Sequence, residues 1–124
     1  MKNNYCLVAV LSLAVFSAAV VASPQPARSN FTAFWSQFKG AVARQDAAAV
    51  ADMTKLPFTY EDKSLDRAAF ITQYKKIFGG LKSCVAKEKP VRDGETYSIF
   101  CGEQGLLFQK AGGEYKFVEF FAND

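Results

Sequence analysis

Hydrophobic positions spaced three and four apart predict a helix soon after the start of the chain. Asn30 is suited to cap it, because its side-chain oxygen can accept hydrogen bonds from amides of the first turn. The apolar positions that follow are Phe31, Phe34, Trp35, Phe38 and Val42. This spacing places them on one face of an amphipathic helix from Phe31 to about Arg44.

Two further helices are predicted from capping residues. Asp46 can cap a short helix from Ala47 to about Lys55, and Asp66 can cap a longer one from Arg67 to Phe78. Between them, Phe58–Tyr60 has the composition of a short strand. For the aromatic residues of these helices, core packing is the favoured interpretation. The alternative is that some of them line a ligand pocket.

The last third of the chain, Lys82 to Phe121, predicts four β-strands in succession. The first would run from Lys82 to Lys89, and Gly112-Gly113 suits a two-residue turn between the last two. The predicted fold class is therefore α+β, with three N-terminal helices packed on a four- to five-stranded, mostly antiparallel sheet. We expect a single domain over residues 30–124.

Cys84 and Cys101 predict a disulfide. If Pro90 pairs with Glu95 across the first turn, the same register places the two cysteines opposite each other. Directly opposed Cβ atoms lie about 4.5–5.5 Å apart, close to disulfide geometry. The alternatives are two buried thiols or half of a metal site. A four-ligand zinc site would need carboxylates, because the chain has no histidine.

Tight turns throughout would give the predicted sheet two distinct faces. The face expected under the helices holds Cys84, Ala86, Tyr97, Ile99, Cys101, Leu106, Phe108, Tyr115, Phe117, Glu119 and Phe121. The opposite face holds Val85, Lys87, Lys89, Ser98, Phe100, Leu107, Gln109, Lys116, Val118 and Phe120. A bulge at Gly102 or Gly105 would exchange the faces beyond it.

Glu119 is the one candidate for chemistry. On the apolar face, opposite Leu106, its carboxylate would be desolvated, which raises the pKa and suits an acid, a base or a ligand anchor. The favoured alternative is that Glu119 sits at the end of the sheet, reaching water or pairing with Lys or Arg. The predicted pocket is lined by Trp35, Tyr60, Tyr74, Phe78, Phe117 and Glu119.

The opposite face retains an apolar cluster that predicts an interface. Its members are Val85, Phe100, Leu107, Val118 and Phe120. Exposed apolar patches of this kind mark binding surfaces. We expect self-association of two chains, sheet to sheet.

The first 22 residues have the layout of a secretory signal peptide. Lys2 precedes an uncharged apolar run from Leu7 to Val21, and small side chains precede a cut at Ser23. The alternative is an uncleaved anchor, but the run is shorter than the about 20 residues that span a bilayer. We therefore expect a signal peptide at 1–22, a flexible leader at 23–29, and a periplasmic or secreted protein without stable membrane insertion after cleavage.

Charge and composition narrow the function further. The net charge of +3 is small, and no run of Lys or Arg is longer than two residues. Nucleic-acid binding needs clustered positive charge, so it is not expected. Histidine is absent, which removes the usual metal ligand and the usual general base near neutral pH. The sequence indicates neither a metal nor another cofactor.

The order of elements resembles the nuclear-transport-factor-2-like superfamily. The resemblance covers residues 31–124 and rests on Phe34-Trp35 with Phe38, on Leu56-Pro57-Phe58, and on the closing hairpin that contains Gly113 to Phe117. It also rests on Asp46 with Val50 and Met53, and on Phe70 with Tyr74 and Phe78. It is closest to small exported bacterial members with a cysteine pair in the sheet. The resemblance implies a curved sheet that wraps a long helix into a cone and encloses a pocket.

Three functions remain open at this point. The favoured one is an exported, non-enzymatic domain that binds a small apolar or amphipathic ligand or a protein partner. The second is a lyase or isomerase that uses Glu119 as its base, which requires a tyrosine hydroxyl or another acid nearby. The third is a purely structural domain whose role is dimerisation.

Overall fold

The structure is a computed structural model that describes residues 28–123. The signal peptide predicted at 1–22, and the leader up to residue 27, lie outside the described residues. The helices are α1 (Phe31–Ala43), α2 (Ala47–Asp52), α3 (Arg67–Thr72), α4 (Tyr74–Phe78) and α5 (Lys82–Lys87). The strands are β1 (Phe58–Tyr60), β2 (Lys63–Leu65), β3 (Val91–Asp93), β4 (Thr96–Cys101), β5 (Gln104–Ala111) and β6 (Glu114–Ala122).

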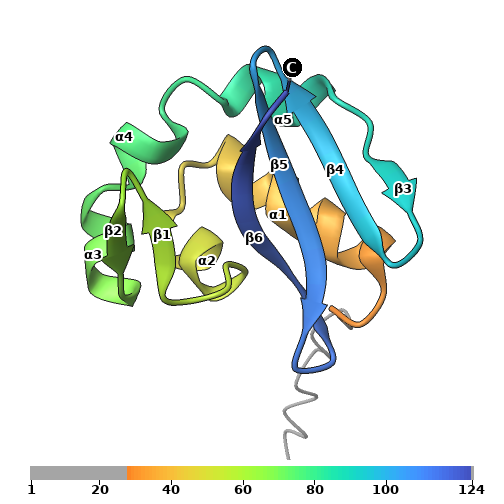
Figure 1. Ribbon diagram of the computed structural model, residues 1–124, viewed down its shortest axis with the longest axis horizontal. Helices are drawn as coiled ribbons and strands as arrows, with labels where there is room; N and C mark the ends of the chain where they lie inside the picture. Colours follow the sequence, from red (N-terminus) through yellow and green to blue (C-terminus); the bar gives the residue numbers. More distant parts are fainter. Residues whose placement is uncertain (1–27, 124) are drawn as a thin grey trace, which may run out of the picture.

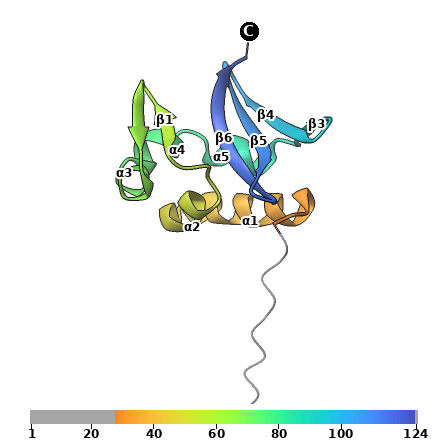
Figure 2. The same ribbon diagram turned by 60° about the horizontal axis from the view of Figure 1, so that its bottom comes forward.

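The strands form two antiparallel sheets, one of four strands in the order β3-β4-β5-β6 and one made of the hairpin β1-β2. Figures 1 and 2 show α1 packed across one face of the four-stranded sheet, which we call the inner face. No described helix covers the opposite, outer face. The α+β class is confirmed. The predicted arrangement of three helices before the sheet is not confirmed. A further helix, α5, lies in the region that was predicted to be the first strand of the sheet.

The predicted helix caps are confirmed. The Asn30 side chain accepts a hydrogen bond from the Thr32 amide at 2.9 Å, and the Asp46 carboxylate accepts one from Ala49 at 3.1 Å. Asp66 caps α3 in the same way, at 2.8 Å from the Ala69 amide.

The long third helix predicted from Arg67 to Phe78 is instead two short helices. α3 ends at Thr72, and α4 begins at Tyr74. The Thr72 hydroxyl donates a hydrogen bond to the Ala68 carbonyl at 3.0 Å, and this kind of back-bonding bends helices.

The first predicted strand, Lys82 to Lys89, is wrong. Residues 82–87 form α5, which packs against α1 through Val85, only 1% exposed. The alternation that favours a strand is weak here, and the short helix is held by the buried Val85 and by the bond of Cys84 to β4. The hairpin partner of β4 is β3, which pairs Val91 with Ser98 and turns at Gly94-Glu95.

A bulge in β6 corrects the predicted faces of the last strand. The pairing shifts between Leu107 and Phe108, so that Phe108 lies opposite Phe117 while Leu107 lies opposite Glu119. Val118 is the extra residue. An extra residue reverses the side-chain alternation beyond it. Glu119 and Phe121 therefore lie on the outer face, and Phe120 on the inner one. The two-residue turn at Gly112-Gly113 is confirmed, with φ of +64° and +83°.

Aromatic rings fill the space between α1 and the sheet. Phe34 and Phe38 from α1 meet Phe108 from β5, with the Phe38 and Phe108 ring centroids 5.2 Å apart. Phe117 from β6 packs on Phe108 at 5.8 Å, and all four side chains are fully buried. The core is therefore one continuous set of ring contacts from the first helix to the last strand.

Candidate functional site

The residues predicted to line a pocket do not surround one. Trp35, Tyr74, Phe78 and Phe117 are buried in the core, and Tyr60 is half-buried beside it. Phe78 packs on Tyr74 and on Phe117, while Trp35 packs on Phe38 and Phe108 and Tyr60 packs on Phe120. No pocket is found among residues 28–123.

Glu119 does not lie on the apolar face, and its exposed side chain agrees with the favoured alternative, in which the carboxylate reaches water. It pairs with Leu107 rather than lying opposite Leu106, and its side chain is exposed on the outer face. The described tyrosines lie elsewhere: Tyr97 and Tyr115 are on the inner face, and Tyr60 and Tyr74 belong to the β1 and α4 region. The structure therefore does not bring Glu119 together with a tyrosine hydroxyl.

Among the described residues, Tyr74 is the one buried group whose pKa is shifted. Its ring stacks on Phe78 with centroids 5.3 Å apart, and its hydroxyl is buried without a hydrogen-bond partner in the described part of the chain. Burial, assisted by the negative charge of Asp46, raises the pKa of Tyr74 to about 12. The hydroxyl therefore stays protonated at neutral pH. No signal in the sequence separates this tyrosine from the other core aromatics.

The outer face of the four-stranded sheet carries an apolar strip. We define the outer strip as Val91, Phe100, Leu107, Val118 and Phe121. Its most exposed members are Val91 and Phe100, at 54% and 37%. The Phe121 ring lies over Gly105, where a Cβ would collide with it, and meets the Phe100 ring edge-on at 5.8 Å.

The outer strip differs from the predicted interface in two of its five members. Phe100, Leu107 and Val118 are on the outer face, as predicted. Val85 is instead buried in α5, and Phe120 packs inward on Phe117 at 5.0 Å. Sequence reasoning missed Val91, because it lay in the predicted first turn. It missed Phe121, because a bulge was considered only at Gly102 or Gly105 and not at Val118.

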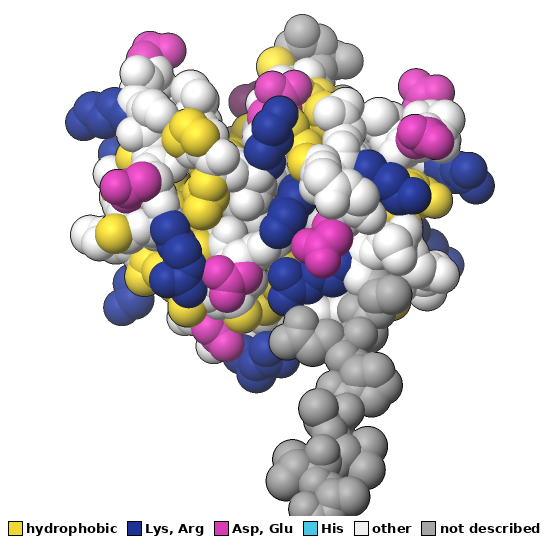
Figure 3. All heavy atoms as spheres, turned by 90° about the horizontal axis from the view of Figure 1, so that it is seen from below, with side chains coloured by type: hydrophobic (Ala, Val, Ile, Leu, Met, Phe, Trp, Pro, Cys, Tyr) yellow, Lys and Arg dark blue, Asp and Glu magenta, His cyan; other side chains and the backbone are white. Residues whose placement is uncertain are grey.

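On the face shown in Figure 3, acidic and basic side chains are mixed and no large patch of one charge stands out. Over the described range, His, Cys, Asp and Glu residues form no group of three that could hold a metal ion. Within the same range, no helix is long and apolar enough to cross a membrane.

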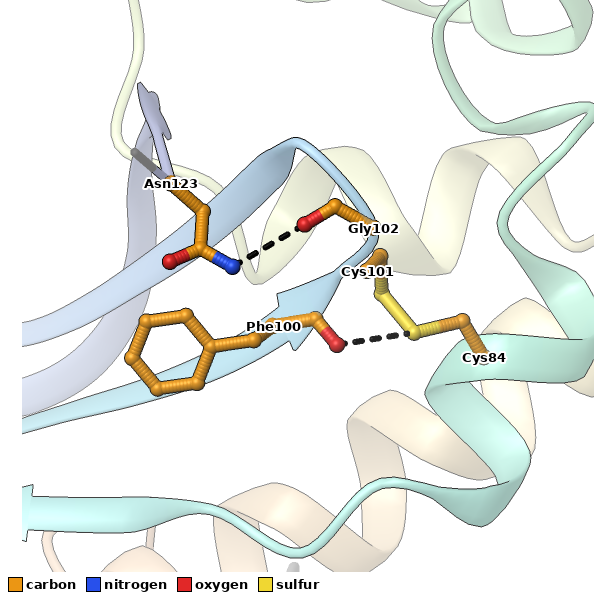
Figure 4. Close-up of a disulfide and its surroundings, with 5 residues drawn as sticks. All are labelled: Cys84, Phe100, Cys101, Gly102 and Asn123. Carbon is orange, nitrogen blue, oxygen red and sulfur yellow. Dashed lines mark hydrogen bonds between the residues drawn. A yellow bond between two sulfur atoms is a disulfide. The ribbon is translucent and has the colours of Figure 1, made fainter.

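The predicted disulfide is confirmed, although its geometry is not the expected one. Cys84 in α5 bonds to Cys101 at the end of β4, with Cα atoms 5.7 Å apart. Figure 4 shows the bond joining the helix to the sheet, with the Cys84 sulfur 3.5 Å from the Phe100 carbonyl oxygen. Beside it, Asn123 donates a hydrogen bond to the Gly102 carbonyl at 3.0 Å. A disulfide is compatible with an exported protein.

Comparisons of this chain with family models, with curated proteins and with solved structures found no match.

Proposed function

We propose that this is an exported, non-enzymatic protein-binding domain that pairs with a second copy of itself through the outer face of the sheet. The observation that carries the proposal is the exposed outer strip on a face that no described helix covers, beside an interior filled by aromatic rings. Apolar side chains exposed together on one sheet face favour burial against another surface.

One pair of charged residues beside the outer strip favours a second copy as the partner. Asp93 on β3 and Lys116 on β6 lie in the same row across the sheet, because Asp93 pairs with Thr96 and Lys116 pairs with Gln109. Packed sheets keep their strands nearly aligned. A two-fold axis along the strands would place β3 of one copy over β6 of the other. Asp93 of each copy would then face Lys116 of the other, which gives two equivalent contacts.

Lys116 keeps a donor for a second copy despite two internal contacts. Its ammonium group donates to the Asp52 carbonyl at 2.6 Å and forms an ion pair with the Glu114 carboxylate at 3.8 Å. An ammonium group has three donors, so one remains for a carboxylate of a second copy. Asp93 is exposed.

Sedimentation measurements on purified protein test the proposal. Wild type should be a dimer, and Phe100→Asp should weaken dimerisation at least about tenfold, because a charge would be buried in the strip. Ser64→Asp adds the same charge to the exposed strand β2 and should leave the dimer intact. A monomeric wild type at high concentration would refute the proposal.

Charge reversal tests the orientation of the two copies. Asp93→Lys and Lys116→Asp should each weaken the homodimer through like-charge contacts. A mixture of the two variants should recover a heterodimer, since both contacts then join opposite charges. If the mixture does not associate better than either variant alone, the two-fold axis does not run along the strands.

Two other interpretations receive less support. Binding of a small apolar ligand would need an interior cavity, and enzymatic proton transfer would need an acid or a tyrosine beside Glu119. Native mass spectrometry of protein from its own exported fraction separates these cases. A retained small molecule would favour a pocket, and a clean dimer would favour the interface. Membership of the nuclear-transport-factor-2-like superfamily, with its cone shape, is likewise a proposal that rests on the order of the elements.

A further inference from the structure

The edge of β6 is divided into a covered half and an open half. In the covered half, the chain binds its own backbone. The Tyr115 amide donates to the Arg28 carbonyl at 2.9 Å. The Phe117 amide donates to Met53, and the Phe117 carbonyl accepts from Lys55, both at 2.8 Å. The single bridge between Thr54 and Phe117 is parallel. This edge therefore already accepts extended backbone.

The register shows which groups of the open half point outward. Successive residues of an antiparallel strand direct their N–H and C=O groups alternately toward the neighbouring strand and away from it. The backbone N–H and C=O groups of Phe117 point away from β5, so those of Phe108, opposite it, do not point toward β6. The backbone groups of Leu107 and Gly105 do point toward β6. Their partners, Glu119 and Phe121, are consequently the hydrogen-bonded residues.

Phe120 and Ala122 must then direct their backbone groups away from the sheet. The hairpin β1-β2 lies beside β6 but belongs to a separate sheet, so it does not pair with this edge. Apart from the pairing with β5, no backbone hydrogen bond from the described residues reaches Phe120 or Ala122. We call residues 118–122 the open edge.

The open edge lacks the features that usually prevent strand pairing. Its sequence, Val-Glu-Phe-Phe-Ala, has strong strand propensity, no proline and a single charge. The other edge of the sheet contrasts with it: β3 has only three residues, Pro90 precedes it, and Arg92 lies within it. Short strands, proline and basic residues protect an edge against pairing.

We propose that the open edge of β6 binds an extended peptide segment of another protein by strand addition. The peptide backbone would bond to Phe120 and Ala122. Alternate peptide side chains would lie on the inner side next to Phe120 and Tyr60, which are half-buried with ring centroids 6.4 Å apart. The intervening side chains would lie next to Glu119 and Phe121 on the outer side. The fitting partner is thus a strand with apolar residues at every second position and a Lys or Arg beside Glu119.

Selection from phage-displayed random dodecapeptides tests this inference. Peptides enriched on the full folded domain should show alternating apolar residues. The most enriched peptide, made synthetically, should bind Ala122→Pro at least about tenfold more weakly than wild type, because proline removes an outward N–H. The substitution leaves the pairing with β5 in place, since the Ala122 amide points away from it. Ser64→Asp, on the exposed strand β2, should bind the peptide as wild type does.

Hydrogen exchange of single amides gives a second readout. The Phe120 amide should become protected when the peptide binds, while the Phe121 amide, which faces Gly105, should be protected with and without it. The inference is overturned if no peptide is enriched, if Ala122→Pro binds equally well, or if the Phe120 amide is unchanged. It is also overturned if Ala122→Pro separates a wild-type dimer, because a second copy would then occupy the edge. If Phe100→Asp loses dimerisation and Ala122→Pro does not, the result supports the dimer through the outer strip and does not count against peptide binding at the open edge.

Discussion

Among single residues, Tyr74 has the clearest destabilising effect on the folded state. Its buried hydroxyl has no hydrogen-bond partner among the described residues, and an unpaired buried polar group costs about 1–3 kcal/mol. Tyr74→Phe should therefore raise the free energy of unfolding by about 1 kcal/mol at neutral pH, which urea denaturation can measure. Tyr60→Phe, at a half-buried position, is the matched control and should change stability little. A destabilised Tyr74→Phe would mean that the hydroxyl has a partner in solution.

The same residue predicts a dependence on alkaline pH. The pKa of Tyr74 is raised from its ordinary value of 10.0 to about 12 by burial and by Asp46. The folded state therefore keeps the tyrosine proton up to a higher pH than the unfolded state does. Between pH 10 and 12 the folded state binds more protons, and stability falls as pH rises. Other tyrosines ionise in the same range, so the measurement is the difference between wild type and Tyr74→Phe. That difference should widen above pH 10.

Among the elements, α5 depends most on a covalent link. It contains six residues, too few to be stable alone, and Cys84 ties it to β4 across a sequence separation of 17. The chain-entropy estimate for a loop of this size is about 3 kcal/mol. Cys84→Ala/Cys101→Ala should lower the free energy of unfolding by about this amount, and a reducing agent should bring wild type to the same value. A loss below about 1 kcal/mol would show that the Val85 contact with α1 is sufficient.

The elements also show what the sequence could reveal. Caps at Asn30, Asp46 and Asp66 and the Gly112-Gly113 turn were predictable, because each depends on a few neighbouring residues. The assignment of residues 82–87 to a strand was wrong because links to distant parts of the chain, the burial of Val85 and the disulfide of Cys84, decide their conformation. The bulge at Val118 depends on how β6 fits β5, and it has no local signal. The outer strip was therefore only partly predictable, and the position of Glu119 was predicted on the wrong face.

At the scale of the whole molecule, the filled interior separates a surface-binding protein from one that carries a small ligand. Phe117 is fully buried among Phe38, Phe58, Phe78 and Phe108, with ring centroids 5.1–6.1 Å away. Phe117→Ala should cost about 4 kcal/mol and leave an apolar cavity. Benzene should then raise the melting temperature of Phe117→Ala, because a ligand that binds only the folded state stabilises it, and should leave wild type unchanged.

If the alanine variant is too unstable to fold, the same benzene experiment can be done on Phe117→Leu. Leucine removes less volume, so it should cost less and respond more weakly to benzene than Phe117→Ala. The order of the responses, alanine above leucine above wild type, follows from cavity size alone. If benzene stabilised wild type as much as the variants, the interior would already hold room for a small apolar molecule. The outer face would then lose its advantage as the binding surface, and the small-ligand function would become the better proposal.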